Sequence, residues 1–150
     1  TYMESKPFII GVNGSPYKDG IVCEILDSVM KAAEKAGAET KTIHLYDLDM
    51  RPIPGNYSKD HASETATNMP PDDVTALYPE ILRADGLVLA TPVYWANMSA
   101  VMKNFIEHLS PLENDGFALL GKTAAFIAAS RICAAPAASP MRPATLTGKC

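Results

Sequence analysis

Four short apolar segments, separated by stretches with a helical pattern, constrain this chain more than any other feature. Residues 8–12, 86–90 and 122–129 are continuous apolar runs, which are typical of strands buried on both faces. Residues 40–46 alternate apolar and polar side chains and indicate a less buried edge strand. Strands that alternate with helices require a parallel sheet covered on both faces. The sequence therefore predicts an α/β fold with three layers, α/β/α.

The intervening segments have the period of amphipathic helices. After a loop at 15–20, one stripe of a predicted helix contains Val22, Ile25, Leu26, Val29, Met30 and Ala33. Asp72 can cap a second helix, which Pro79 should kink or restart, and Ser99 can cap a third, on which His108 is expected to face water. The connection over 47–71 has no sustained period and is expected to flank a ligand site.

Composition excludes several classes of protein. With 150 residues, 47% of them hydrophobic, the chain can bury a core of its own, and no apolar run reaches the roughly 20 residues of a membrane span. The net charge of −4 and the scattered basic residues argue against a nucleic-acid partner. Three cysteines without metal-ligand spacing fit a reducing, cytoplasmic setting, and we expect neither a disulfide framework nor a metal site.

The regular pattern ends near residue 130. We therefore expect one domain over 1–130 and an irregular tail over 131–150 that is rich in alanine and proline. The expected strand order is 2-1-3-4, with a fifth strand missing, so that 122–129 becomes an edge strand whose apolar run 124–129 carries no charge. Such an edge tends to find a partner, and we expect a homo-oligomer.

Two segments with unusual chemistry follow predicted strands. Residues 14–20, Gly-Ser-Pro-Tyr-Lys-Asp-Gly, combine glycines, a hydroxyl and the start of a helix, which suits a phosphate but is also common in a simple helix cap. Residues 91–99, Thr-Pro-Val-Tyr-Trp-Ala-Asn-Met-Ser, carry the only tryptophan, which suits a flat ring or a capping hydrophobic cluster. In a parallel sheet both would lie at the carboxyl ends of strands, where ligands bind.

Together these two segments resemble the flavodoxin-like NAD(P)H-dependent FMN reductase and quinone oxidoreductase family. In that family a strand that ends in Gly-Ser-Pro opens the phosphate loop, and Thr-Pro-Val-Tyr-Trp followed by Asn-Met-Ser lines the isoalloxazine ring. The resemblance covers residues 7–130. It implies a flavodoxin-like fold, FMN as cofactor and NAD(P)H as electron donor.

The resemblance also implies which residues bind FMN. The residues implied at the phosphate are Ser15, Asp19, Gly20, Ile21 and Val22. Those implied at the ribityl chain and the flavin edge are Pro92, Val93, Tyr94, Trp95 and Asn97. The implied reaction passes hydride from NAD(P)H through FMN to a small-molecule acceptor, which is a quinone, an azo compound, a nitro compound or a flavin. The cofactor carries that chemistry, so no catalytic side chain is expected.

The chain departs from the family in its phosphate loop. Where the family has a basic residue and then Gly-Asn-Thr, this chain has Tyr17 and then Gly20-Ile21-Val22. Hydrogen bonds to charged groups contribute roughly 1.5–3 kcal/mol each, so FMN binding is expected to be weaker. Residues 51–55 lack the cysteines of the related iron–sulfur flavoproteins, and no iron–sulfur centre is expected. Two alternatives remain open, namely a flavodoxin-type electron carrier and a truncated, non-catalytic remnant.

Overall fold

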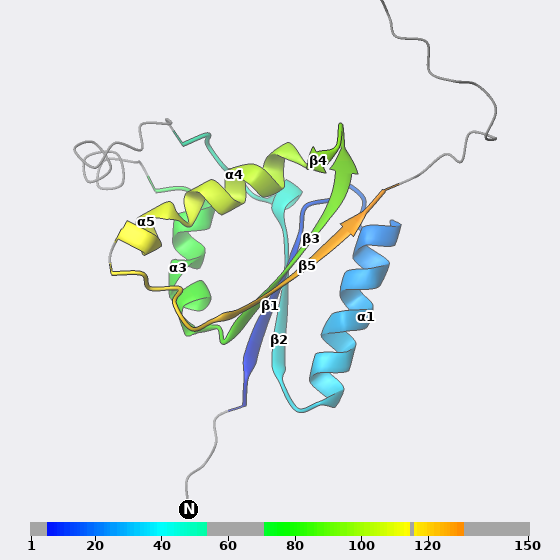
Figure 1. Cartoon of the computed structure of the whole chain (residues 1–150), viewed down its shortest axis with the longest axis horizontal. Helices are drawn as coiled ribbons and strands as arrows, with labels where there is room; N and C mark the ends of the chain where they lie inside the picture. Colours follow the sequence, from blue (N-terminus) through cyan, green and yellow to red (C-terminus); the bar gives the residue numbers. More distant parts are fainter. Residues whose placement is uncertain (1–5, 54–70, 115, 131–150) are drawn as a thin grey trace, which may run out of the picture.

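A computed structural model describes three stretches of the chain, which are residues 6–53, 71–114 and 116–130. Their centre is a sheet of parallel strands with helices on both faces (Figure 1). The predicted three-layer α/β/α fold is confirmed. The expected tail over 131–150 and the middle of the long connection lie outside the described residues.

The sheet has the predicted strand order. β1 (Phe8–Asn13) lies between β2 (Glu39–His44) and β3 (Gly86–Tyr94), and all three run parallel. β5 (Thr123–Ala129) pairs in parallel with the other side of β3 and is the fourth strand of the prediction. The order of the parallel strands is therefore β2-β1-β3-β5, and β5 has no further partner among the described residues.

The end of β3 differs from the prediction. We expected a loop to begin at Thr91, but the strand continues to Tyr94 and turns back into a two-residue strand, β4 (Asn97–Met98). β4 runs antiparallel to β3, with Val93 opposite Met98 and Tyr94 opposite Asn97. The second predicted ligand segment is thus a β-hairpin that projects beyond the sheet (Figure 1).

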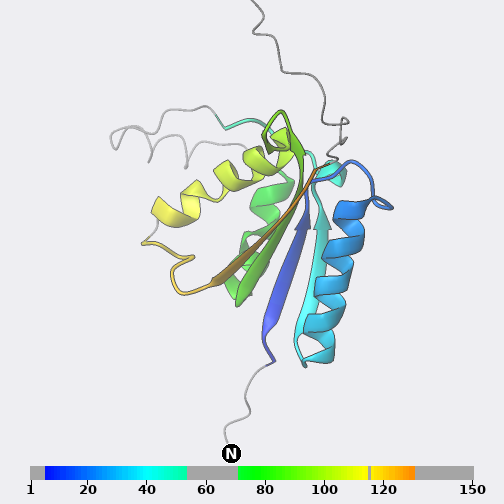
Figure 2. The same ribbon diagram turned by 45° about the vertical axis from the view of Figure 1, so that its right-hand side comes forward.

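The helices divide unequally between the two faces. α1 (Ile21–Lys35) covers one face by itself, and the opposite face carries α3 (Asp73–Arg83), α4 (Ala100–His108) and the short α5 (Ser110–Asn114), as Figures 1 and 2 show. No helix in the described part of the chain is long and apolar enough to span a membrane.

Each face has its own hydrophobic core. The core under α3 and α4 contains alternate residues of β1 and β3 together with large side chains such as Ile81 and Phe105. The core under α1 is smaller and consists of Val22, Leu26, Met30, Val88 and Ala90. The helix approaches β1 closely at Gly11, where a Cβ atom would lie only 2.9 Å from the Met30 sulfur. A larger residue at this position would force the Met30 and Leu26 side chains to move.

Two expectations about the helices were wrong, and of the two effects expected at Pro79, a kink or a restart of the helix, the restart does not occur. Ile25 and Val29 are more than a third exposed, because no second helix lies beside α1 among the described residues. Pro79 does not restart α3, which remains one helix because Val74 and Ile81 pack on either side of it in the same core. His108 does not face water but is completely buried.

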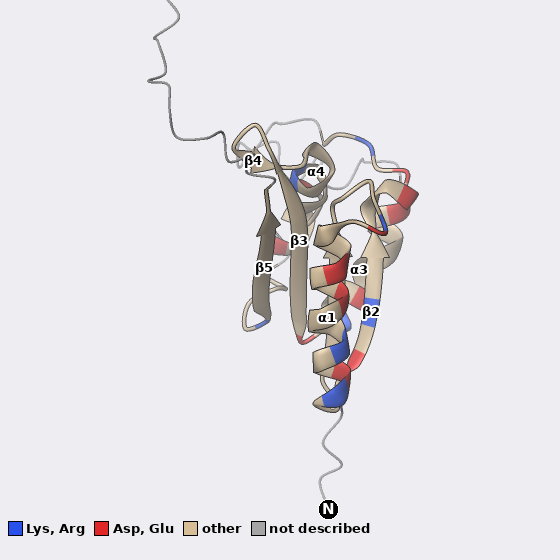
Figure 3. Cartoon of the chain, turned by 90° about the vertical axis from the view of Figure 1, so that its right-hand side faces the viewer, with Lys and Arg blue, Asp and Glu red and all other residues tan. Residues whose placement is uncertain are grey.

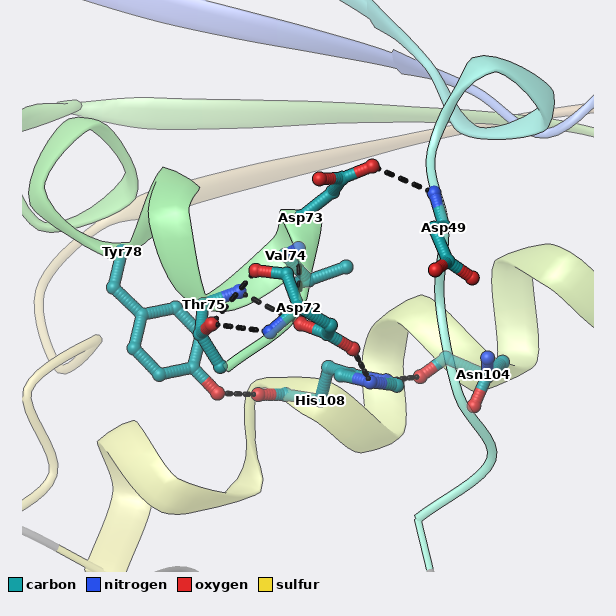
Figure 4. A network of polar contacts seen from close by, with 8 residues as sticks. All are labelled: Asp49, Asp72, Asp73, Val74, Thr75, Tyr78, Asn104 and His108. Carbon is teal, nitrogen blue, oxygen red and sulfur yellow. Dashed lines mark hydrogen bonds and ion pairs between the residues drawn. The ribbon is translucent and has the colours of Figure 1, made fainter. Parts of the chain in front are cut away.

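The burial of His108 follows from its partners on α3 and α4 (Figure 4). Its Nδ1 donates to the carbonyl oxygen of Asn104 over 2.8 Å, and its Nε2 lies 2.8 Å from Oδ2 of Asp72. The other carboxylate oxygen of Asp72 accepts the backbone N–H groups of Val74 and Thr75 and so caps α3, as predicted. This cluster joins the beginning of α3 to the end of α4.

Charged side chains are distributed unevenly over the structure. On the side drawn in Figure 3, α1 carries acidic residues toward its start and both lysine and glutamate toward its end, whereas β5 carries no charge. Phe126, in the middle of β5, is 72% exposed. In the described part of the chain, the side of the sheet at β5 is therefore apolar.

Candidate functional site

A cavity of about 540 Å³ lies at the carboxyl ends of β1, β3 and β5. This volume is within the range of small-molecule sites, and the carboxyl edge of a parallel sheet is where such sites form. The cavity is lined by residues from three segments, namely Ser15, Tyr17, Gly20, Ile21, Val22, Pro92, Val93, Tyr94, Ala129 and Ser130. The two segments singled out in the sequence therefore form one site.

Three of the ten expected cofactor-binding residues do not line this cavity. Asp19 is exposed beside it, and the amide oxygen of Asn97 accepts the backbone N–H of Met98 over 2.8 Å. Trp95 is fully exposed at the tip of the β3–β4 hairpin. The sequence suggested that the whole aromatic segment would line the site, but the turn directs the indole ring into solvent.

The hairpin turn has an unusual backbone. Trp95 and Ala96 have φ values of 49° and 60°, so both central residues are left-handed, as a type I′ turn requires. Neither residue favours this conformation, which costs roughly 1–2 kcal/mol for a residue with a Cβ atom. The rim of the cavity is therefore held in a strained conformation.

The loop between β1 and α1 is held by hydrogen bonds from side chains at its start. The amide oxygen of Asn13, a completely buried residue, accepts the backbone N–H of Ser15 over 2.9 Å. The Asn13 amide nitrogen faces Nδ1 of His44 at 3.1 Å and donates to it. Ser15 Oγ accepts the backbone N–H of Tyr17 over 3.2 Å, which leaves the hydroxyl proton free to reach a ligand.

The beginning of α1 supplies the polar end of the cavity. The N-cap residue Gly20 makes no side-chain hydrogen bond to the helix, so the first N–H groups of α1 are not capped by a side chain. They carry the positive end of the helix dipole, which favours an anion. Ile21 is 58% exposed at this point, whereas Val22 belongs to the core under α1.

The charges near this loop compensate one another. Lys18 Nζ lies 2.6 Å from Oδ2 of Asp47, and both side chains are more than half exposed. The hydrogen bond from Lys18 lowers the pKa of the Asp47 carboxyl, against a smaller opposing effect of burial. No charged residue lines the cavity among the described residues, so its polar end depends on hydroxyl and backbone N–H donors.

The described residues offer no metal site. They contain no group of three or more His, Cys, Asp and Glu side chains placed to hold a metal ion. Cys23 is buried on α1, and burial, followed by the nearby Asp27 carboxylate, raises the pKa of its thiol. This cysteine is a packing residue, as its place in the helical pattern indicates.

Sequence reasoning missed part of the cavity wall. Tyr17 was noted only as a departure from the family pattern, although it lines the cavity. Ala129 and Ser130 lie at the carboxyl end of β5. The rule that ligands bind at the carboxyl ends of parallel strands located the other two segments and could have located these residues too.

Comparison with known proteins decides the family. The family model described as NADPH-dependent FMN reductase matches residues 7–143. The chain belongs to that family. Its members use FMN with NAD(P)H as electron donor, and the family is one of oxidoreductases. The sequence resemblance is thereby confirmed.

The curated relatives are longer than this chain. An iron–sulfur flavoprotein of Methanocaldococcus jannaschii is 31% identical over 121 residues, which cover 80% of this chain and 60% of the relative. An iron–sulfur flavoprotein of Methanosarcina thermophila is 30% identical over 118 residues, which cover 78% of this chain and 60% of the relative. The chain thus spans about 60% of the length of these two family members.

Solved structures support the flavodoxin-like fold. The NAD(P)H:quinone oxidoreductase from Methanothermobacter marburgensis has a TM-score of 0.60 at 17% identity, over 87% of this chain and 90% of that protein. RosB with bound 8-demethyl-8-formylriboflavin-5'-phosphate has a TM-score of 0.62 at 23% identity, over 83% of this chain and 52% of that protein. At these identities the likeness concerns the fold alone.

Proposed function

We propose that this chain is an FMN-dependent NAD(P)H oxidoreductase that reduces a quinone, an azo compound, a nitro compound or a free flavin. The observation that carries the proposal is the cavity of about 540 Å³ in which the loop after β1 meets the end of β3. Family membership supports the choice of FMN and NAD(P)H. The choice of acceptor is the range that the family resemblance implies.

The residues of the cavity fit FMN at both ends. Ser15 Oγ and the first N–H groups of α1 are donors of the kind that bind a phosphate. Pro92, Val93 and Tyr94 form an apolar wall with an aromatic ring, which suits the isoalloxazine. When bound, FMN would accept a hydride and pass electrons on, and the chain's own residues would hold it and limit its contact with water.

The fit is weaker at the phosphate than at the ring. Ile21 and Val22 offer no side-chain donor where the family has Asn and Thr, and Lys18 is already paired with Asp47. We propose that FMN binds with its phosphate at Ser15 and Gly20, and that Asp19, Trp95 and Asn97 contact it only if the loop and hairpin close over it. No acid–base side chain is proposed.

The first experiment is a titration with FMN followed by turnover. Trp95 is the only tryptophan, so its emission should be quenched by FMN bound beside the hairpin. With FMN present, the oxidation of NADH and of NADPH is then followed with a quinone as acceptor. Turnover supports the proposal, FMN binding without turnover indicates an electron carrier, and the absence of binding indicates a non-catalytic remnant.

A matched pair of variants locates the ring. Tyr94 and Tyr46 are exposed to a similar extent, at 43% and 49%, but only Tyr94 lines the cavity. Tyr94→Ala should weaken FMN binding by about tenfold, in line with roughly 1–1.5 kcal/mol for an aromatic stack. Tyr46→Ala should leave the affinity unchanged, and equal effects of the two variants would place the ring elsewhere.

We also propose that the chain forms a homo-oligomer. Among the described residues β5 pairs only with β3, its seven residues carry no charge, and strand edges of this kind pair readily with another strand. Light scattering over a dilution series should detect the oligomer, and Phe126→Lys should shift it to the monomer. A wild-type monomer at micromolar concentration would contradict this proposal. A cytoplasmic setting and the absence of a nucleic-acid or membrane partner stay predictions.

A further inference from the structure

The cavity has two halves, which we call the phosphate half (Ser15 to Val22) and the ring half (Pro92 to Tyr94). The hydroxyl group of Ser99 joins them, although Ser99 does not itself line the cavity. Ser99 follows β4, is completely buried, and caps α4 by accepting the backbone N–H of Met102 over 3.4 Å. Its Oγ donates to the backbone carbonyl oxygen of Gly14 over 2.8 Å. One side chain of the ring half therefore holds the main chain of the phosphate half, 85 positions earlier in the sequence.

The main chain at Gly14 is fixed from both sides. Its N–H donates to the carbonyl oxygen of Ala90 in β3 over 2.8 Å, while its carbonyl oxygen accepts the Ser99 hydroxyl. The close approach favours glycine, since a Cβ atom at position 14 would lie 3.0 Å from Ser99 Oγ and 3.1 Å from Met102 Cβ and would force these neighbours to shift. A methyl group there would press directly on the hydrogen-bonded hydroxyl.

Ser99 is attached to the ring half mainly by its backbone N–H, and its Oγ also lies 3.3 Å from Thr91 Oγ1. Its backbone N–H donates to Thr91 Oγ1 over 2.9 Å, and Thr91 lies in β3 immediately before the cavity wall at Pro92. This bond belongs to the main chain of Ser99 and survives replacement of the side chain. The hydroxyl provides the side-chain link to Gly14, in addition to the main-chain bond from the Gly14 N–H to Ala90, and hence to Ser15, the next residue.

We propose that Ser99 is a positioning residue for FMN, which holds the phosphate loop at a fixed distance from the ring wall. This inference rests on the proposed function. FMN contacts both halves at once, so a chain in which the halves are already joined loses less conformational freedom on binding. Riboflavin, which lacks the phosphate, uses the ring half and should depend little on the link.

The test compares the affinities of FMN and riboflavin, measured by quenching of flavin fluorescence, in the wild type and in Ser99→Ala. Loss of the buried hydrogen bond to Gly14 is expected to weaken FMN binding by about tenfold. Riboflavin binding should change by less than about twofold, because the Ser99 N–H to Thr91 bond remains. Ser28→Ala is the control, since Ser28 also donates its hydroxyl to a backbone carbonyl, that of Glu24, but away from the cavity.

A second variant addresses the same contact from the other side. Gly14→Ala should weaken FMN binding selectively as well, and the double variant Gly14→Ala/Ser99→Ala should be little weaker than either single variant, because both remove one interaction. If Ser99→Ala does not fold, Ser99→Cys is used instead, because it has a similar volume and a weaker hydrogen-bond donor. It should weaken FMN binding more than riboflavin binding, but by less than Ser99→Ala.

The outcomes separate this inference from the proposed function. If the wild type binds FMN and Ser99→Ala binds it equally well, the link has no role and the inference is overturned. An equal loss for FMN and riboflavin overturns it too, since Ser99 would then act only as a helix cap. If the wild type binds neither flavin, the proposed function itself is wrong.

Discussion

Under α3 and α4 the described part of the chain buries fourteen clustered apolar residues and a paired carboxylate and imidazole, whereas five such residues hold α1 on the opposite face. The cavity lies on the second, thinner side, between the start of α1 and the end of β5. Binding sites are commonly drawn from the less stable regions of a protein. We therefore call the face under α3 and α4 the scaffold face, and the face under α1, where the cavity lies, the ligand face.

The largest expected effect is at the buried pair on the scaffold face. Both ring nitrogens of His108 lie within hydrogen-bond distance of oxygen atoms, the Asn104 carbonyl and the Asp72 carboxyl, and the His108 side chain is completely buried. Removing one member of a buried pair costs roughly 3–5 kcal/mol. His108→Ala should lower the free energy of unfolding, measured in urea, by about that amount.

The control for this variant lies on the same helix. Lys103 and Glu107 form an exposed pair with 3.1 Å between nitrogen and oxygen, and Lys103→Ala should change the free energy of unfolding by less than about 1 kcal/mol. If the two variants had similar effects, the scaffold face would not depend on the buried pair, and the contrast between the faces would be lost.

A second prediction concerns the pH dependence of this pair. Burial alone would raise the pKa of Asp72, but the Thr75 N–H and the His108 ring outweigh it and hold the pKa below the ordinary value of 3.8. The stabilisation is therefore complete well above pH 3.8 and is lost as the pH falls through the lower folded-state value. Urea unfolding between about pH 6 and pH 2.5 should show this loss, and Asp72→Asn should lack that part of the slope.

On the ligand face, the expected effect is on affinity and not on folding. Ile21→Asn places an amide beside the exposed start of α1 and should raise the affinity for FMN by about tenfold, with no gain for riboflavin. Val22 is only 3% exposed, so the companion change Val22→Thr would bury a hydroxyl in the core. The single variant is therefore the cleaner test.

A control is available one turn further along α1. Ile25 is also an exposed isoleucine on the same helix, but it does not line the cavity. Ile25→Asn should leave both flavin affinities unchanged. An FMN affinity that is unaltered in Ile21→Asn would mean that the phosphate does not lie at the start of α1.

The parts of the fold that depend on local pattern were predicted from the sequence. The buried strands and the capping of α3 by Asp72 follow from apolar runs and short-range residue preferences. His108 could have been recognised from its spacing, because Val101, Phe105 and His108 share one side of α4. Its partner, however, lies 36 positions away, and only packing of the two helices brings them together.

The two halves of the site also differ in how far local sequence determines their structure. Ser15 and Gly20 are where a strand-to-helix turn places them, because that turn is local. The direction of Trp95 was missed, because a type I′ turn is normally signalled by Asn-Gly or a similar pair, and Trp95-Ala96 carries no such signal. Pairing of β3 with β4 imposes the turn on residues that do not favour it.

The smallest expected effect is at this turn on the rim of the cavity. Ala96 has φ 60°, and Ala96→Gly removes the steric cost of that conformation while it adds freedom to the unfolded chain. The net result should be an increase of about 0.5–1 kcal/mol in the free energy of unfolding. Ala36→Gly is the matched control, because Ala36 has φ −80° and should lose roughly 0.5–1 kcal/mol instead. If both variants destabilise the protein equally in urea, the turn stores no strain and the ligand face is as relaxed as the scaffold face.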